Sequence, residues 1–114
     1  MTKVYGIKNC DTVKKARNWL DKHNIGYQFH DLRQDGITQT DLNQWIGSVG
    51  WEALLNKRST TWRQLADQDK TAIDANKAMS LMLANPTLIK RPVIIHGKAT
   101  LVGFNETDYK KVLG

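Results

Sequence analysis

The 114-residue sequence predicts an α/β protein built on a mixed four-stranded sheet. Near the N-terminus, two strand-like segments flank an amphipathic helical segment. This β-α-β order implies parallel strands joined by a right-handed crossover. Near the C-terminus, two more strand-like segments are joined by a tight turn and followed by a helix, which adds an antiparallel pair to the sheet. A helical block at about 38–84 separates the two halves. We therefore expect one domain over 1–114, with the block as an insertion.

The first β-α-β unit is indicated by hydrophobic periodicity. Residues 3–7 form a short apolar strand. The helix at 12–24 is predicted by apolar residues at helical spacing: Val13, Ala16 and Leu20. Gly26 follows as a stop signal. Residues 27–32 alternate apolar and polar side chains, as in a half-buried strand.

The insertion begins with a helix-start signal at Thr38, which has Asp41 three residues later. The helix that follows has a buried stripe formed by Leu42, Trp45, Ile46 and Val49. A short helix is expected around 51–55. A longer helix is expected over 72–84, and it ends at Asn85 because the residue before a proline avoids the helical region.

The C-terminal part reads as a hairpin and a helix. Residues 92–95 form a continuous apolar run, which is typical of a strand covered on both faces. Gly97-Lys98 predicts a two-residue turn into a strand at 99–102. Asn105 is the expected N-cap of the last helix.

Composition excludes several classes of protein. With one cysteine the chain cannot form an internal disulfide, and one cysteine with three scattered histidines offers no metal site. No apolar run approaches the ~20 residues of a membrane span, and the N-terminus lacks a signal peptide, which predicts a cytoplasmic protein without membrane contact. The net charge of +6 permits an anionic partner. Because the basic residues are dispersed, it equally fits a solvated surface, and no direct nucleic-acid binding is predicted.

Cys10 lies between the first strand and the first helix. The unpaired N–H groups of a first helical turn stabilise a thiolate, which makes the thiol more reactive than a free cysteine. Lys8 and Lys14 add positive charge nearby, while Asp11 opposes them unless it caps the helix. A buried, inert cysteine is the alternative, but polar neighbours in a loop favour a reactive thiol.

The chain has no Cys-x-x-Cys pair, because Val13 stands where the second cysteine would be. Redox chemistry at Cys10 therefore needs a second sulfur from glutathione or from another protein.

Two arginine-containing segments are further candidates. Arg58 and Arg63 lie in the chain's richest cluster of hydrogen-bond donors, which suits an oxyanion or carboxylate, or else a surface loop with salt bridges. Arg91 precedes Pro92 at the start of a buried strand, and the bond between them is either trans or, less commonly, cis.

Four segments of the sequence together resemble the arsenate-reductase-like (ArsC/Spx) family, closest to small bacterial YffB-type proteins. They are Tyr5-Gly6-Ile7-Lys8-Asn9-Cys10-Asp11-Thr12-Val13-Lys14-Lys15-Ala16, Leu54-Leu55-Asn56-Lys57-Arg58-Ser59-Thr60-Thr61-Trp62-Arg63, Arg91-Pro92-Val93 and Val102-Gly103-Phe104-Asn105-Glu106. The resemblance covers nearly the whole chain. It implies a thioredoxin-like βαβ…ββα fold with a helical insertion.

The resemblance also implies roles for individual residues. Cys10 matches the family's nucleophile. Pro92 matches the family's cis-proline, which lies against the active cysteine in this fold, and Arg91 matches the arginine before that proline. Arg58 matches an arginine of the Spx-like branch. Glutathione or the substrate is expected to contact these last three residues together with the neighbours of the cysteine, which are Lys8, Asn9, Thr12 and Lys14.

Two departures from the family pattern argue against arsenate reduction. Arsenate reductases have an arginine where this chain has Asn56, and another after the hairpin, where residues 97–114 contain none. Spx-type regulators commonly carry the Cys-x-x-Cys pair that is absent here.

The sequence thus predicts a monothiol reductase that uses Cys10 as nucleophile. No cofactor is expected to stay bound, and glutathione is the expected co-substrate, with a small thiol or oxyanion as substrate. The alternative is a non-catalytic, Spx-like regulatory protein that binds a protein partner such as RNA polymerase.

Overall fold

The computed structural model describes residues 2–114, and the chain divides into two compact units. The first runs to Asp35 and resumes at Arg91, and the second spans Gly36–Lys90. The second unit contains the predicted insertion at 38–84 within slightly wider limits. No helix within residues 2–114 is both long enough and apolar enough to cross a membrane.

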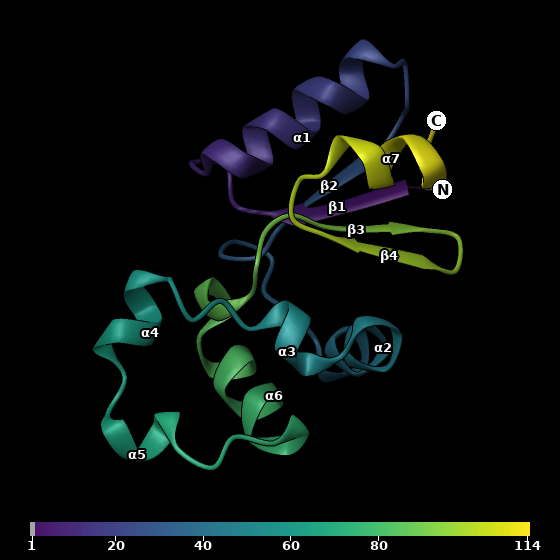
Figure 1. Ribbon diagram of the computed structural model, residues 1–114. Coiled ribbons are helices and arrows are strands. Elements are labelled where there is room, and N and C mark those ends of the chain that lie inside the picture. The colour runs from purple at the N-terminus through teal and green to yellow at the C-terminus, as the bar shows by residue number, and fades with distance from the viewer. Residues whose placement is uncertain (1) are drawn as a thin grey trace. The chain divides into compact units, whose positions relative to one another are not determined.

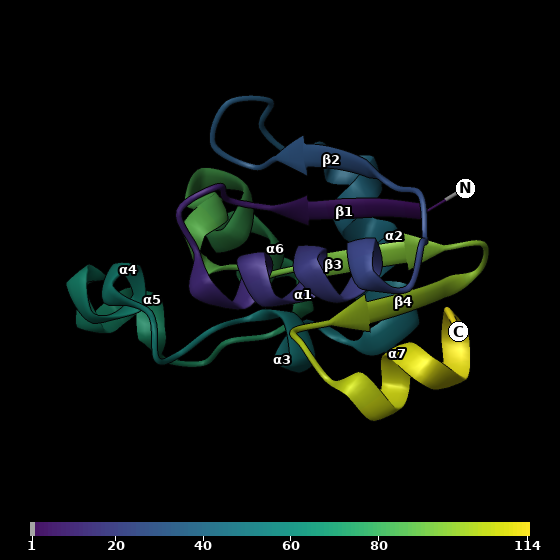
Figure 2. The same ribbon diagram turned by 90° about the horizontal axis from the view of Figure 1, so that it is seen from above.

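The first unit contains the sheet and two helices (Figures 1 and 2). Its elements are β1 (Thr2–Gly6), α1 (Asp11–Lys22), β2 (Gln28–Asp31), β3 (Val93–His96), β4 (Ala99–Val102) and α7 (Glu106–Val112). The strand order is β2-β1-β3-β4; β1 pairs with β2 in parallel, and the other two pairings are antiparallel. The predicted mixed sheet, crossover and hairpin are therefore confirmed, and the topology is the thioredoxin-like βαβ…ββα arrangement.

Both helices of this unit pack on one face of the sheet (Figure 1). The core between them consists of Val4, Ala16, Trp19, Leu20, Ile94 and Tyr109, all buried. Trp19 of α1 and Tyr109 of α7 meet edge to face with ring centroids 5.3 Å apart. The Tyr109 hydroxyl donates to the Gly103 carbonyl at 2.6 Å, and burial raises the pKa of this phenol.

Helix α1 matches its prediction except at its ends. It ends at Lys22, before the predicted stop at Gly26, and Asn24 adopts a left-handed conformation with φ of 56°. The Ile25 N–H then reaches back to the Leu20 carbonyl at 2.9 Å. Asparagine tolerates this backbone region better than most residues, which explains the early stop.

The second unit is helical. It contains α2 (Gln39–Val49), α3 (Trp51–Leu54), α4 (Thr60–Gln64), α5 (Asp67–Lys70), α6 (Ala75–Ala84) and the 3₁₀ turn η1 (Pro86–Leu88). The Thr38 hydroxyl accepts from the Asp41 N–H at 3.1 Å, so the predicted cap of α2 is confirmed. Helix α6 begins three residues later than predicted, because Asp74 accepts from the Lys77 N–H and Ala72 has a positive φ of 52°.

A short backbone ladder closes the second unit. Leu55 and Ile89 form an isolated antiparallel bridge. The Asn56 N–H donates to the Leu88 carbonyl, and the Lys90 N–H donates to the Leu54 carbonyl, both at 2.7 Å. The segments at 54–56 and 88–90, more than thirty residues apart in the chain, therefore lie side by side.

Candidate active site

Cys10 is the N-cap of α1. Its backbone is extended (φ −128°, ψ 122°), its carbonyl accepts from the Lys14 N–H at 2.9 Å, and its side chain makes no capping hydrogen bond. The thiol is free and half-buried. Cys10 therefore stands at the positive end of the helix dipole, and its sulfur does not cap the helix.

A close approach between β1 and α1 sets the position of this loop. A Cβ added to Gly6 would lie 2.8 Å and 3.1 Å from the two Cγ atoms of Val13, which is fully buried. Only glycine fits at the end of β1 while Val13 occupies the first turn of α1. The close contact between Gly6 and Val13 therefore fixes the distance that residues 7–9 span between β1 and Cys10.

Pro92 lies at the same end of the sheet. Tyr5 of β1 pairs with Val93 of β3, which places the preceding Pro92 beside the end of β1, where the Cys10 loop begins. The Arg91–Pro92 peptide bond is cis, as the family resemblance implied. The buried Pro92 accepts a hydrogen bond at its carbonyl from the Gly103 N–H at 2.8 Å.

Lys8 has a carboxylate neighbour as well as the thiol loop. The backbone N–H of Gln34 donates to Asp31 and holds the pKa of this carboxyl below its usual value, although burial opposes the shift. The backbone N–H of Arg33 and the positive charges of Lys8 and Arg33 lower the pKa further. Both N–H groups reach Asp31 Oδ1, at 3.1 Å from Gln34 and 2.8 Å from Arg33. The charge of Lys8, two residues before Cys10 in the sequence, therefore also stabilises the Asp31 carboxylate.

The other predicted neighbours of Cys10 have mixed environments. Asn9 and Lys14 are exposed, and Thr12 is half-buried in the first turn of α1. Asp11 is the first residue of the helix, so the suggestion that it caps α1 is wrong. Further along α1, Arg17 donates to the Tyr27 hydroxyl at 3.0 Å and lies over the Phe29 ring at 4.3 Å, so its charge is directed away from the thiol loop.

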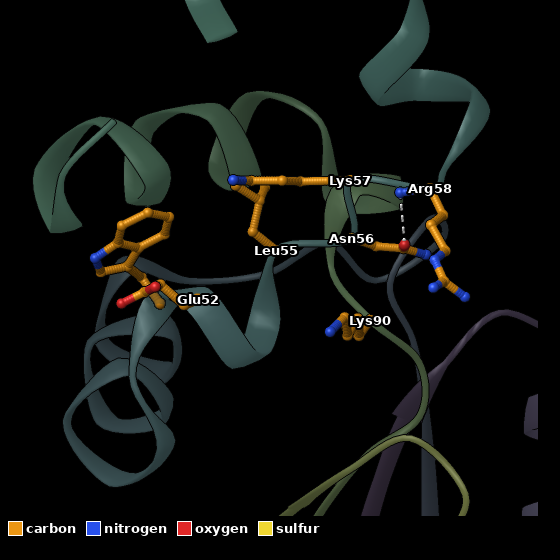
Figure 3. A pocket seen from close by; sticks show the side chains of 7 residues that line it. Glu52, Leu55, Asn56, Lys57, Arg58 and Lys90 are labelled. Carbon is orange, nitrogen blue, oxygen red and sulfur yellow. Dashed lines mark hydrogen bonds between the residues drawn. The ribbon is translucent and has the colours of Figure 1, made fainter. Parts of the chain in front are cut away.

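Arg58 belongs to the second unit. It is exposed and lines a cavity there together with Lys57 and Lys90 (Figure 3). Arg63 is exposed on α4. Sequence reasoning identified Arg58 but missed Lys90, because only the ladder between 54–56 and 88–90 brings that lysine to the cavity.

No metal-binding arrangement is found within residues 2–114, where no three His, Cys, Asp or Glu side chains gather. The chemistry that the first unit offers is that of a thiol at a helix start. A mixed four-stranded sheet, a helix-capping cysteine and a cis-proline at the same end of the sheet define a thioredoxin-like protein with a single thiol.

The chain belongs to the ArsC family, whose family model matches residues 5–112. An "Uncharacterized protein" of Haemophilus influenzae is 53% identical over 110 residues, which are 96% of each chain. A "Global transcriptional regulator Spx" of Streptococcus agalactiae is 30% identical and aligns with 99% of this chain and 83% of the regulator. Among solved structures, a YffB protein is 46% identical with a TM-score of 0.97 and covers all of both chains.

Proposed function

We propose that the chain is a glutathione-dependent monothiol reductase whose nucleophile is Cys10. The observation that carries the proposal is the position of this cysteine as the N-cap of α1 with its side chain outside any capping hydrogen bond. A helix start favours the thiolate over the thiol, and the thiolate is the attacking species. Membership of the ArsC family supports the same class of chemistry.

The proposed reaction is two successive thiol–disulfide exchanges. The Cys10 thiolate attacks the glutathione sulfur of a mixed disulfide; the old S–S bond breaks, Cys10 becomes glutathionylated, and the substrate leaves as a thiolate that takes a proton from water. A glutathione thiolate then attacks the adduct, which releases glutathione disulfide and restores the Cys10 thiolate. The mixed disulfide is reduced and glutathione is oxidised, and no internal second cysteine is required.

The remaining predicted contacts have a role in this scheme. Lys8, Lys14 and the α1 N-terminus favour negative charge at the sulfur, and Asn9, Thr12 and Pro92 border the position of the bound glutathione. Arg91 is the proposed partner of a glutathione carboxylate, since a guanidinium pairs well with a carboxylate. No cofactor is retained between turnovers, and the reducing cytoplasm supplies the glutathione.

The test is turnover of a defined mixed disulfide. The protein is incubated with glutathione and with the disulfide between glutathione and mercaptoethanol, and glutathione disulfide is measured. We expect turnover that Cys10→Ser abolishes, and an adduct of one glutathione on the wild-type protein by intact mass. Wild-type protein that forms no adduct, or Cys10→Ser protein that retains turnover, would contradict the proposal.

Arsenate reduction is not proposed. Asn56 stands at the position of a family arginine, and its side-chain Oδ1 accepts from the Arg58 N–H at 3.0 Å, so it holds a local turn. We predict that Asn56→Arg loses this hydrogen bond and gains no arsenate reductase activity, because residues 97–114 still lack the second arginine. Arsenate-dependent oxidation of glutathione by either protein, measured against Cys10→Ser, would contradict this prediction.

A regulatory role is the second candidate, favoured by the 30% identity to a global transcriptional regulator. In that case the protein binds RNA polymerase, and Cys10 is a sensor or has no role. Pull-down with purified polymerase distinguishes the two. Stoichiometric binding that survives Cys10→Ser, without mixed-disulfide turnover, supports the regulator and excludes the reductase.

A further inference from the structure

The second unit has a cavity of about 540 Å³ on its surface. Its lining residues are Trp51, Glu52, Leu55, Asn56, Lys57, Arg58 and Lys90 (Figure 3). Small-molecule sites typically measure about 300–1,000 Å³. The cavity is therefore large enough for an organic molecule, and every residue that lines it belongs to the unit Gly36–Lys90.

The charge of the cavity is unbalanced. Lys57, Arg58 and Lys90 carry three positive charges against the single negative charge of Glu52. Within residues 36–90, all of which the structure describes, none of the three cations forms an ion pair with a carboxylate. The only ring contact of Lys57 is a distant one, with its Nζ 5.8 Å from the centroid of Trp62. The three cationic groups can thus accept an anion without first breaking an ion pair.

Backbone hydrogen bonds fix the two segments that carry these cations. Asn56 accepts from the Arg58 N–H, which fixes the turn that carries Lys57 and Arg58. Lys90 is fixed across the Leu55–Ile89 bridge by its own N–H bond to the Leu54 carbonyl. Positioning charges on a closed backbone ladder reduces the entropy lost when a ligand binds.

The cations are spread along the cavity and do not converge on one point. Figure 3 shows the Lys57 and Arg58 side chains extending in different directions from the turn, with Lys90 on the opposite strand segment. The buried Leu55 also lines the cavity, so part of its wall is apolar. A compact tetrahedral oxyanion would reach only part of this set of cations, whereas a longer molecule with an acidic group at each end matches their spread.

We propose that this cavity binds a small organic dianion with its two acidic groups separated by an aliphatic chain. Lys57 pairs with one acidic group and Arg58 with the other, and Lys90 adds positive charge to the cavity. This site is separate from the reaction proposed for Cys10, and binding of a dicarboxylate to it does not depend on the Cys10 thiol.

The test uses adipate as the probe and follows backbone amide shifts of the full chain by NMR. Adipate is expected to bind and to shift the amides of residues 54–58 and 90. Hexanoate has one carboxylate and inorganic phosphate is compact, so both are expected to bind more weakly. Cys10→Ser is expected to bind adipate as the wild type does, so failure of the reductase proposal leaves this result unchanged.

The variant Lys57→Gln/Lys90→Gln should weaken adipate binding about fivefold to tenfold, as expected for the loss of two exposed charges. The matched control is Lys110→Gln/Lys111→Gln, which removes two exposed lysines from α7. Its affinity should stay within twofold of wild type. The proposal is overturned if adipate does not bind, if phosphate binds as tightly as adipate, or if both double variants weaken binding equally; amide spectra establish that each variant is folded.

Discussion

Asp31 ends β2 and organises the turn that follows. Its Oδ1 accepts the N–H groups of Arg33 and Gln34, and its own N–H donates to Asp35 Oδ2 at 3.1 Å. These donors bind the carboxylate more strongly than the neutral acid, which is why the pKa is lowered. A lowered pKa in the folded state means that ionised Asp31 stabilises the fold above the unfolded-state pKa, near 4, and that this contribution is lost as the pH falls through the folded-state value.

We therefore predict that Asp31→Asn lowers the free energy of unfolding by about 1 kcal/mol at pH 7, where charge-assisted hydrogen bonds are lost. The difference from wild type should shrink as the pH falls below about 4. Urea denaturation at several pH values measures it, with Asp21→Asn on the exposed side of α1 as the charge-matched control. A difference that is unchanged between pH 7 and pH 3 would rule out this role.

Gly6 is the residue for which the structure leaves least room. We predict that Gly6→Ala destabilises the fold by about 1–3 kcal/mol, the usual cost of overpacking, because the new methyl group meets the stiff, buried Val13. Gly26→Ala is the control, since its Cβ would have no neighbour within 4 Å. Thermal or urea unfolding gives both values. Equal stability of the two variants would show that α1 moves freely away from β1.

At the scale of the element, α1 differs from the other long helices in its cap. Helices α2 and α6 have the N-cap residues Thr38 and Asp74, whose side chains accept a backbone N–H, whereas the N-cap of α1 is Cys10, whose side chain makes no such bond. Thiols are weak hydrogen-bond acceptors, so a cysteine at this position leaves the helix start without a strong cap. A cysteine that lowers helix stability at this position is consistent with a thiol kept for function.

We predict that Cys10→Ser unfolds at a higher urea concentration than Cys10→Ala. Its free energy of unfolding should be about 0.5–2 kcal/mol higher, because serine caps the helix and alanine cannot. The two variants lack the thiol equally, so the comparison isolates the cap. Equal midpoints would indicate that the N–H groups of the first turn are not open to a side chain at position 10.

Element prediction from sequence succeeded where periodicity and caps agreed. Thr38 and Asn105 were identified as caps, and both accept the expected N–H groups. The short helices α4 and α5 and the turn η1 were missed, because segments of three to five residues are too short to show a helical period. Ser59, which accepts from the Trp62 N–H, was the one available signal for α4.

At the scale of the whole molecule, the parallel crossover and the antiparallel hairpin could be predicted, because a β-α-β unit and a tight turn have few alternatives, whereas the strand order came from the structure. The pairing of β1 with β3 then placed Pro92 beside the Cys10 loop. The family resemblance matches Pro92 to a cis-proline, but the sequence itself left the isomer open, since X–Pro bonds mostly favour trans. The cavity with Lys57 and Lys90 could not be predicted, because its two sides meet through a ladder between distant segments.

The central claim is that the start of α1 makes Cys10 a reactive thiolate. The most direct measurement is the rate of Cys10 alkylation by iodoacetamide at pH 7, in the native protein and in urea. The account predicts that the native thiol is alkylated clearly faster than the thiol of the unfolded chain, because the thiolate is the attacking species. A native rate equal to that of the unfolded chain, or slower, would contradict the account.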